Sequence, residues 1–360
     1  MCIFAVKMSI TPLVVHHPMR PLSRHRFAAS LCPWLLAAVL VVYGCGCGGR
    51  RGDDAAPKPV SRGLPYELVV IVPRQAYEGE LHDTLDAILR GSTPVLPQHE
   101  PLFRLNVTFT DANLTPWRTF RNRLIVKIDE QLREATLGVA RDVVARPQTE
   151  VMVAGHDVHQ LAVFLGRQRD VLTDLFVESE LEWQAAQLRR KHNKESSEAL
   201  RRLCGHTICV PPALRASKLG TDFLWTGTNL NDRDQNFVYY SYPWDGRPLT
   251  RSQYVRRRDS VMRVNIPGRD PGQWMQTAVS PVTGEPLVVI RARTLYNSRV
   301  LEVHGLWELR NGALGGAFVA LERVDTARRR VIATEGFIYS PHSPKRNIMR
   351  EMEAALRTFR

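Results

Sequence analysis

The stretch Leu68-Val69-Val70-Ile71-Val72 is a continuous apolar run, mostly of β-branched residues, which is typical of a buried strand. An amphipathic helix is predicted directly after it, because the apolar residues between Tyr77 and Arg90 recur on one helical face and Gly91 suits the position that follows a helix. Further strands are predicted at residues 103–109, 123–128, 151–153 and 208–210. Residues 63–215 are therefore predicted to form an N-terminal α+β half.

The longest helical segment of this half runs from Val158 to Leu203, which contains no proline and only one glycine, Gly166. Asp157 is predicted to cap its first turn. The sequence leaves open whether the segment is one long helix or a helical hairpin. Its apolar stripe consists of Leu161, Leu165, Leu172, Leu175 and Phe176.

After residue 220 the pattern changes to short strand-like segments that are separated by clusters of Gly, Asn, Asp and Pro. A closing helix is predicted from Pro344 to Phe359, with Ser343 as its N-cap. The fold class is therefore predicted to be α+β, with mostly antiparallel sheets and flanking amphipathic helices in two halves, 63–215 and 216–360. The strands of the second half are predicted at 237–242, 261–266, 287–293, 301–309, 317–324 and 331–339.

Residues 1–44 are predicted to be a signal peptide. Arg20, Arg24 and Arg26 precede the apolar stretch 27–44, and no acidic residue occurs before residue 45. A membrane-spanning helix needs about 20 apolar residues. This stretch is slightly shorter and contains Pro33, so a cleaved signal fits it better than a permanent anchor. Residues 1–18 add nothing to a signal, which makes Met19 an alternative start.

The segment Val42-Tyr43-Gly44-Cys45 resembles a bacterial lipobox, which implies cleavage after Gly44 and a diacylglycerol on the Cys45 thiol. Tyr43 is bulkier than the usual residue there, and Cys47 is a second candidate in a poorer context. The alternative is an uncleaved N-terminal anchor. Residues 45–62 are polar and are predicted to form a tether between the membrane and the folded part. By analogy with lipoprotein sorting, Gly46 indicates the outer membrane, with the folded part facing the periplasm.

The chain carries a formal net charge of +13, from 49 basic and 36 acidic residues. Residues 1–44 contain four basic residues and no acidic one, so cleavage would leave +9. Of the basic residues only seven are lysine; a GC-rich genome explains this bias, and contact with anionic lipid or glycan is the functional alternative. Because an exported, lipidated chain does not meet nucleic acid, charge alone gives no reason to predict a nucleic-acid partner.

Cys204 and Cys209 are the two cysteines within the folded part. Export brings them to an oxidising compartment, so a disulfide that closes a small loop and two separately buried thiols both remain open. The spacing fits no zinc site. His156 and His159 lack a third ligand, so no metal and no cofactor are predicted.

The sequence contains no GxSxG, HExxH, P-loop or GxGxxG motif. Glu335 lies beside Gly336 in a strand-like segment, where it would either act as a general base or pair with a nearby arginine such as Arg346. Trp307 would either line a ligand groove or pack in the core.

An ordered set of short motifs resembles an uncharacterised bacterial lipoprotein family, catalogued as domain of unknown function 4837 and found mainly in Bacteroidetes-type bacteria. The resemblance implies an exported lipoprotein of about this length and brings no established activity, so no catalytic residue is carried over. The motifs span residues 64 to 346: Leu64-Pro65-Tyr66-Glu67, residues 96–103, Arg121-Asn122, Pro147-Gln148, Trp225, Arg258-Asp259, Gly305-Leu306-Trp307, Gly315-Gly316-Ala317-Phe318, and residues 335–341 with Lys345-Arg346.

Two function hypotheses follow. The first is a non-enzymatic envelope lipoprotein, held to the membrane by its lipid, that binds or scaffolds a glycan, a peptide or another protein. The second is an envelope hydrolase or transferase that uses polar residues of the shared motifs, and it predicts that several of them converge in one cleft. The catalytic candidates are Glu100, Arg121 and Glu335, and the ligand-binding candidates are Gln98, Asn122 and Trp307.

Overall fold

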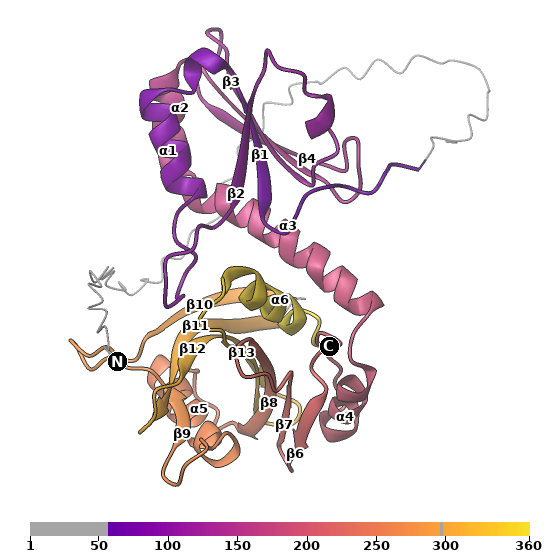
Figure 1. The fold of residues 1–360 in the computed structure, drawn as a ribbon, viewed down its shortest axis with the longest axis vertical. Helices are drawn as coiled ribbons and strands as arrows, with labels where there is room; N and C mark the ends of the chain where they lie inside the picture. The colour runs from indigo at the N-terminus through magenta and orange to yellow at the C-terminus, as the bar shows by residue number, and fades with distance from the viewer. Residues whose placement is uncertain (1–56, 296–297) are drawn as a thin grey trace, which may run out of the picture. The chain divides into compact units, whose positions relative to one another are not determined.

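The computed structural model describes residues 57–295 and 298–360, which form two β-sheets and the helices packed on them (Figure 1). These residues belong to one compact unit. The predicted signal peptide, Cys45 and the tether up to residue 56 lie outside the described residues. No helix in the described part of the chain is both long and apolar enough to cross a membrane.

The first sheet has five strands in the spatial order β2-β1-β3-β5-β4. Its strands are β1 (Glu67–Val72), β2 (Arg104–Phe109), β3 (Asn122–Ile128), β4 (Thr136–Arg141) and β5 (Thr149–Gly155). The pairings of β1 with β2, β1 with β3 and β3 with β5 are parallel, and only β4 runs antiparallel to its neighbour. This sheet therefore differs from the antiparallel pattern of the chain as a whole. The reason is that a helix connects β1 to β2, and such a crossover is what parallel neighbours require.

Three helices cover one face of this sheet: α1 (Gly79–Leu89), α2 (Val158–Arg167) and α3 (Arg169–Arg190). A fourth helix, α4 (Lys194–Cys204), packs on the second core instead. The predicted helical segment 158–203 is thus divided into three helices. Asp157 caps α2 as predicted, since its side chain accepts a hydrogen bond from the Gln160 N–H at 2.7 Å. Two short 3-10 helices, η1 (Arg74–Ala76) and η2 (Thr115–Trp117), complete this half.

The second sheet has the order β10-β11-β12-β13-β8-β7-β6, with β9 paired to β11. All of its pairings are antiparallel. The predicted α+β class with mostly antiparallel sheets is therefore confirmed. The strands are β6 (Ala216–Leu219), β7 (Phe223–Gly227), β8 (Asp234–Pro243), β9 (Trp274–Thr277), β10 (Val288–Leu295), β11 (Ser298–Arg310), β12 (Gly315–Asp325) and β13 (Arg330–Tyr339).

Helix α5 (Arg251–Asn265) replaces most of the strand that was predicted at residues 261–266, so that prediction is wrong. A capping box starts the helix: Thr250 accepts from the Gln253 N–H at 3.3 Å, and the Gln253 side chain accepts from the Thr250 N–H at 3.2 Å. Its buried face, which includes Met262, then repeats every four residues. The strand predicted at residues 208–210 is also absent, because this segment packs as irregular chain in the second core.

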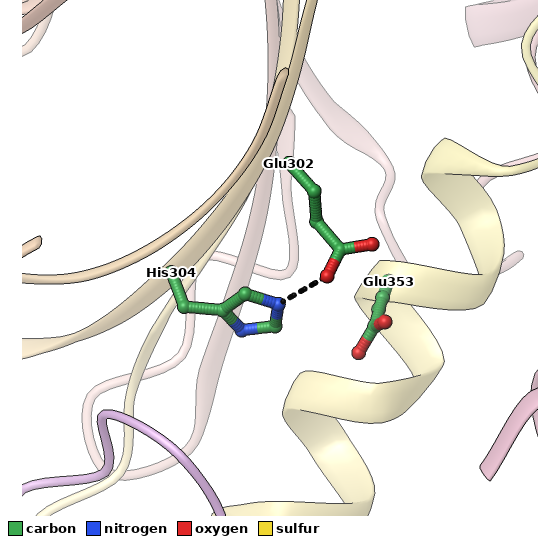
Figure 2. Close-up of side chains that lie close together, drawn as sticks. All are labelled: Glu302, His304 and Glu353. Atoms are coloured by element: carbon green, nitrogen blue, oxygen red, sulfur yellow. Dashed lines mark hydrogen bonds and ion pairs between the residues drawn. The ribbon is translucent and has the colours of Figure 1, made fainter. Parts of the chain in front are cut away.

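Helix α6 (Arg346–Leu356) packs on strands β8, β12 and β13 of the second sheet and on α3 of the first half. At its contact with β13 the backbones approach closely, because a Cβ on Gly336 would lie 2.6 Å from Met352 Cβ. Across its contact with β11, Glu302 and Glu353 face each other (Figure 2). Helix α6 therefore contacts both halves of the described chain.

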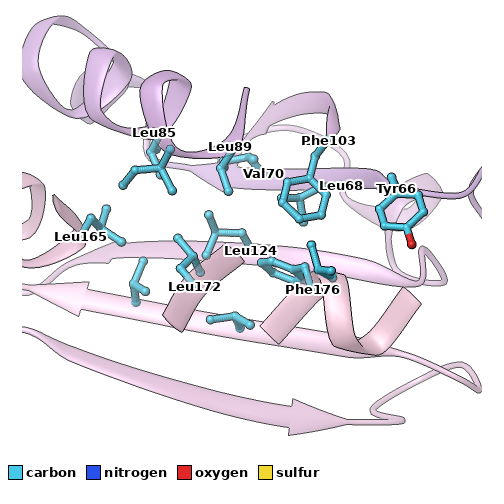
Figure 3. Packing of buried hydrophobic residues seen from close by; sticks show 14 of the residues in the cluster. Tyr66, Leu68, Val70, Leu85, Leu89, Phe103, Leu124, Leu165, Leu172 and Phe176 are labelled. Atoms are coloured by element: carbon cyan, nitrogen blue, oxygen red, sulfur yellow. The ribbon is translucent and has the colours of Figure 1, made fainter. Parts of the chain in front are cut away.

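Three clusters of buried apolar side chains hold the fold together. The first lies between the first sheet and helices α1, α2 and α3, where Leu68 and Leu124 of the sheet meet Leu85 and Phe176 of the helices (Figure 3). The second lies beneath α4 and α6, and the third lies beneath α5 on the opposite face of the second sheet. Two alanines of α6, Ala354 and Ala355, belong to the first cluster rather than the second.

Replacing Phe176 by alanine should lower the free energy of unfolding by about 3–5 kcal/mol, because the ring is fully buried and leaves a cavity. Its ring meets Phe103 edge-on, with the ring centroids 6.0 Å apart. Urea unfolding followed by circular dichroism measures the loss. The control is Val171→Ala on the same helix, where the side chain is 50% exposed, and a change within about 0.5 kcal/mol is expected. Equal losses for the two variants would contradict the assigned core.

Candidate functional site

Gln98 and Glu100 hold the start of α6. The Glu100 carboxylate accepts hydrogen bonds from the backbone N–H groups of Lys345 at 2.7 Å and Arg346 at 2.8 Å. Gln98 donates to Glu100 at 3.0 Å and accepts from the Lys345 ammonium at 2.9 Å. The prediction of Ser343 as the N-cap is therefore wrong. Lys345 occupies the cap position, and its side chain makes no capping hydrogen bond. Glu100, from a distant part of the chain, accepts the hydrogen bonds of the first backbone N–H groups instead.

Arg121 and Asn122 are buried around the carboxylate of Glu180 on α3. Arg121 donates to this carboxylate at 2.7 Å and Asn122 donates to it at 2.5 Å. The guanidinium also lies 3.9 Å from the ring centre of Trp183. These contacts fasten α3 to the start of β3.

Glu335 forms a fully buried ion pair with Arg258 of α5. The guanidinium donates twice, at 2.9 Å and 2.7 Å, in the bidentate geometry that suits a carboxylate. Arg258 also stacks on the Phe318 ring at 3.9 Å and donates to the Thr277 hydroxyl at 3.2 Å. The partner of Glu335 is thus Arg258 rather than the expected Arg346, whose guanidinium donates to the Pro101 carbonyl.

Trp307 is buried in the third core. Its indole N–H donates to the Ile338 carbonyl at 3.1 Å, and its ring meets Phe337 edge-on. Gly316 is required beside it, because a Cβ there would lie 2.0 Å from the Ile338 oxygen. The six residues selected from the sequence therefore belong to separate hydrogen-bonded groups. The enzymatic hypothesis predicted that several of them converge in one cleft, and they do not.

Cys204 and Cys209 are free thiols in this structure. Cys204 packs against the second core and donates to the Leu200 carbonyl, whereas Cys209 packs against the first core. Of the two alternatives left open by the sequence, this structure has the two separate thiols, and their side chains pack against different clusters.

Replacing Glu335 by glutamine should lower the free energy of unfolding by about 3–5 kcal/mol, because the buried Arg258 charge loses its bidentate partner and keeps only Asp259, at 3.5 Å. Thermal unfolding measures the effect. The double variant with Arg258→Met and Glu335→Leu removes both charges and should recover most of the loss. If the single glutamine variant is as stable as the unchanged chain, the pair does not hold α5 in place.

Glu302, His304 and Glu353 form the one cluster of potential metal-ligating groups in the described residues, with ligand atoms within 4.8 Å of one another. Glu302 and His304 extend from β11 and Glu353 from α6 (Figure 2). The His304 ring and the Glu302 carboxylate are joined at 3.2 Å. The donor set alone, a histidine and two carboxylates, suits zinc.

Arginines occupy the same carboxylates, which argues against a cation. Arg293 lies 3.0 Å from Glu302, Arg350 donates to Glu353 at 2.7 Å, and Arg357 donates to Glu353 at 3.3 Å. Burial raises the pKa of Glu353, but Arg350, His304 and Arg357 lower it more, to about 2. A metal ion would have to displace these guanidiniums or lie beside them. The cluster is therefore an ion-pair network that joins α6 to β11.

Glu322 is a buried carboxyl whose only hydrogen bond in the described structure comes from the Tyr242 hydroxyl, at 2.6 Å. It lies on the α5 side of β12, as Glu335 does on the neighbouring strand. Burial raises the pKa of Glu322 to about 7. The hydrogen bond from Tyr242 lowers this pKa, but by less than burial raises it. Of the two buried carboxyls on this face, Glu335 has an arginine partner, whereas Glu322 has no ion pair within the described residues.

Glu322 should make stability depend on pH. The unfolded chain releases this proton near pH 4.5, whereas the folded protein holds it up to about pH 7. Folding therefore takes up a proton between these values, and the free energy of unfolding falls by about 3 kcal/mol as the pH rises through this window. Glu322→Gln keeps the acceptor for Tyr242 without the charge, so this part of the pH dependence should vanish.

Urea unfolding of both proteins at pH 4.5, 6 and 8 measures the difference, with the exposed Glu285→Gln as the control. Glu322→Gln should be the more stable protein at pH 8. A difference from the unchanged chain that does not vary with pH would overturn the assignment.

A groove of about 500 Å³ lies between the C-terminal part of α3 and the first turns of α6; we call it the α3–α6 groove. Its volume falls in the range of about 300–1,000 Å³ that is common for small-ligand sites. Loops at Pro65, Pro212 and Arg233 complete its walls. The lining residues are Pro65, Trp183, Gln184, Gln187, Leu188, Arg190, Lys191, Pro212, Arg233, Asn347, Ile348 and Glu351.

The sequence did not identify this groove. Trp183 and Gln184 lie in a predicted helical segment but outside its apolar stripe. Arg190 and Lys191 fit the solvent-exposed end of a helix equally well. A tryptophan that is followed by amide and cationic side chains on a polar helix is a sequence pattern that could have indicated a binding site. The other wall comes from Arg233 and Asn347, which only the fold brings close.

Residues 193–358 match a family model described as "Domain of unknown function (DUF4837)". Residues 61–189 match a second model, described as "Domain of unknown function (DUF8532)". The resemblance seen in the sequence is thereby confirmed for the second half, whereas the motifs between residues 64 and 148 fall under the second model. The junction lies at the end of α3. No curated protein matches the chain.

Two solved structures are similar to part of the chain. A mutant of the protein Mog1 shares 8% identity with a TM-score of 0.27, over 43% of this chain and 89% of that chain. The Ran-binding protein Mog1p of Saccharomyces cerevisiae shares 10% identity with a TM-score of 0.27, over 44% of this chain and 92% of that chain. At these scores the likeness carries no inference about this chain.

Proposed function

We propose that the chain, whose residues 193–358 match the DUF4837 model and its description without an activity, is an exported lipoprotein that binds a component of the bacterial cell envelope. The binding site in this proposal is the α3–α6 groove. The protein is a binding module and not a hydrolase or transferase.

The observation that carries the proposal is the ligand-sized groove, which contains polar groups without partners. Gln184 is 91% buried, and its side-chain oxygen has no hydrogen-bond partner within the described residues. A buried acceptor without a partner costs about 1–3 kcal/mol, and a bound ligand that donates to it would recover this energy.

The enzymatic alternative has less support. Glu100, Arg121 and Glu335 are each engaged by several partners of the fold, so none is free to transfer a proton to a substrate. The groove contains one acidic side chain, Glu351, and no nucleophile with an adjacent base. Binding without chemistry is what this set of residues supports.

The proposed location in the cell rests on the sequence alone. Cleavage after Gly44 would leave Cys45 as the lipidated first residue, and residues 46–62 would connect it to the fold. Gly46 favours the outer membrane, with the folded part in the periplasm. Durable attachment needs more than one acyl chain, which bacterial lipoproteins provide.

Replacing Cys45 by alanine should abolish lipid attachment and release the protein from the membrane fraction, because the thiol that carries the lipid is gone. Metabolic labelling with an alkyne fatty acid, followed by fractionation of a Gram-negative host, measures both effects. Cys47→Ala is the matched control and should remain labelled. Label that persists in Cys45→Ala, or that is absent from the unchanged chain, would overturn the lipoprotein assignment.

A further inference from the structure

We propose that the α3–α6 groove binds an anionic glycan, meaning sugar rings that carry carboxylate or phosphate groups. The inference rests on the proposed binding function and names the ligand chemistry for the same groove. Three properties of the lining support it: its charge, its aromatic and amide groups, and the absence of a strand edge among its residues.

The cations of the groove are available to a ligand. Arg190, Lys191 and Arg233 are exposed, and none of their side chains has a hydrogen bond or ion pair within the described residues. Many other arginines of the described chain, such as Arg258, are paired. The acid on the lining, Glu351, already accepts from the Gln235 amide at 3.1 Å. Guanidinium and ammonium groups donate strongly to carboxylate and phosphate oxygens, so the lining favours an anion.

Trp183 supplies the surface for a sugar ring. It is half-buried, and the Arg121 guanidinium covers one face of its indole at 3.9 Å. The rest of the ring lines the groove, and its N–H donates no hydrogen bond within the described part of the chain. The electron-rich face of an indole attracts the weakly positive C–H groups of a pyranose, and its N–H can donate to a hydroxyl.

Side-chain amides lie beside this ring. Gln184 brings its buried, unpartnered oxygen, and Gln187 and Asn347 add exposed amides on the two helices. An amide offers both donors and an acceptor, which matches the dual character of sugar hydroxyl groups. The combination of ring, amides and cations therefore fits a charged sugar better than a plain anion.

A peptide ligand fits the groove less well. Extended peptides commonly gain affinity by pairing their backbone with an exposed strand edge. The groove is lined by residues of α3, α6 and loops, and none of its lining residues belongs to a strand. An acidic peptide would find the cations but no backbone partner, and it is therefore the alternative that the experiment has to exclude.

The test uses the full-length chain extracted from membranes in detergent, with binding measured by isothermal titration calorimetry. Four probes separate the alternatives: a uronic acid tetrasaccharide, its carboxyl-reduced neutral counterpart, a phosphorylated disaccharide and a tetraglutamate peptide. The uronate or the phosphorylated sugar should bind, and which of them binds identifies the anionic group. The affinity should fall as the salt concentration rises.

Two variants place the binding in the groove. Arg233→Gln should weaken binding of the acidic sugar about tenfold, since it removes one charged donor. The matched control is Arg269→Gln, an exposed arginine in the α5–β9 loop, which should bind as the unchanged chain does. Trp183→Leu should weaken binding about five- to tenfold. Both groove variants must keep the circular dichroism spectrum of the unchanged chain.

Three outcomes would overturn the inference. If the peptide binds as tightly as the uronate and Trp183→Leu changes nothing, the groove is a charge site for peptides, and the proposed binding function stands. If the neutral sugar binds equally well, the anionic part is wrong. If no probe binds, the anionic glycan is wrong, while labelling at Cys45 still decides the lipoprotein assignment independently.

Discussion

Helix α6 buries Ala354 and Ala355 against the first core while Met352 and Leu356 face the second core. One helix at the end of the chain therefore completes the packing of two halves whose sheets differ in kind. Close packing makes such a shared element sensitive to small changes in volume, because neither core can relax without moving the other. The glycine at position 336 allows this helix to approach β13 closely, since any side chain there would collide with Met352.

Charged side chains fix the orientation of this helix. Glu100 satisfies its first backbone N–H groups from the N-terminal half. At the other end, Arg357 reaches Glu178 of α3, so the helix is joined to both halves. Buried ion pairs add little net stability compared with apolar packing, but breaking one is costly. In a sequence, charged residues of this kind resemble catalytic groups, whereas in this fold they form the ion pairs and hydrogen bonds that hold helices in place.

The α3–α6 groove is a consequence of this arrangement. Its two helical walls, α3 and α6, pack against each other and are joined by the contacts just described, and loops complete the rest of the lining. Packing alone does not account for two features of the groove: the cations without a partner in the described residues, Arg190, Lys191 and Arg233, and the Gln184 oxygen without a hydrogen bond.

The sequence by itself determined the α+β class, most of the strands after residue 287, the cap at Asp157 and the presence of the closing helix, because these follow from local periodicity and capping chemistry. The helix that contains residues 261–265 had a usable local signal, the capping-box pattern of Thr250 and Gln253, which the strand-like residues 261–266 outweighed in the prediction. The partner of Glu335, the cap that Glu100 provides and the walls of the groove were decided only by tertiary structure. Each depends on residues far apart in the chain, which only the packing of α3, α5 and α6 against the two sheets brings together.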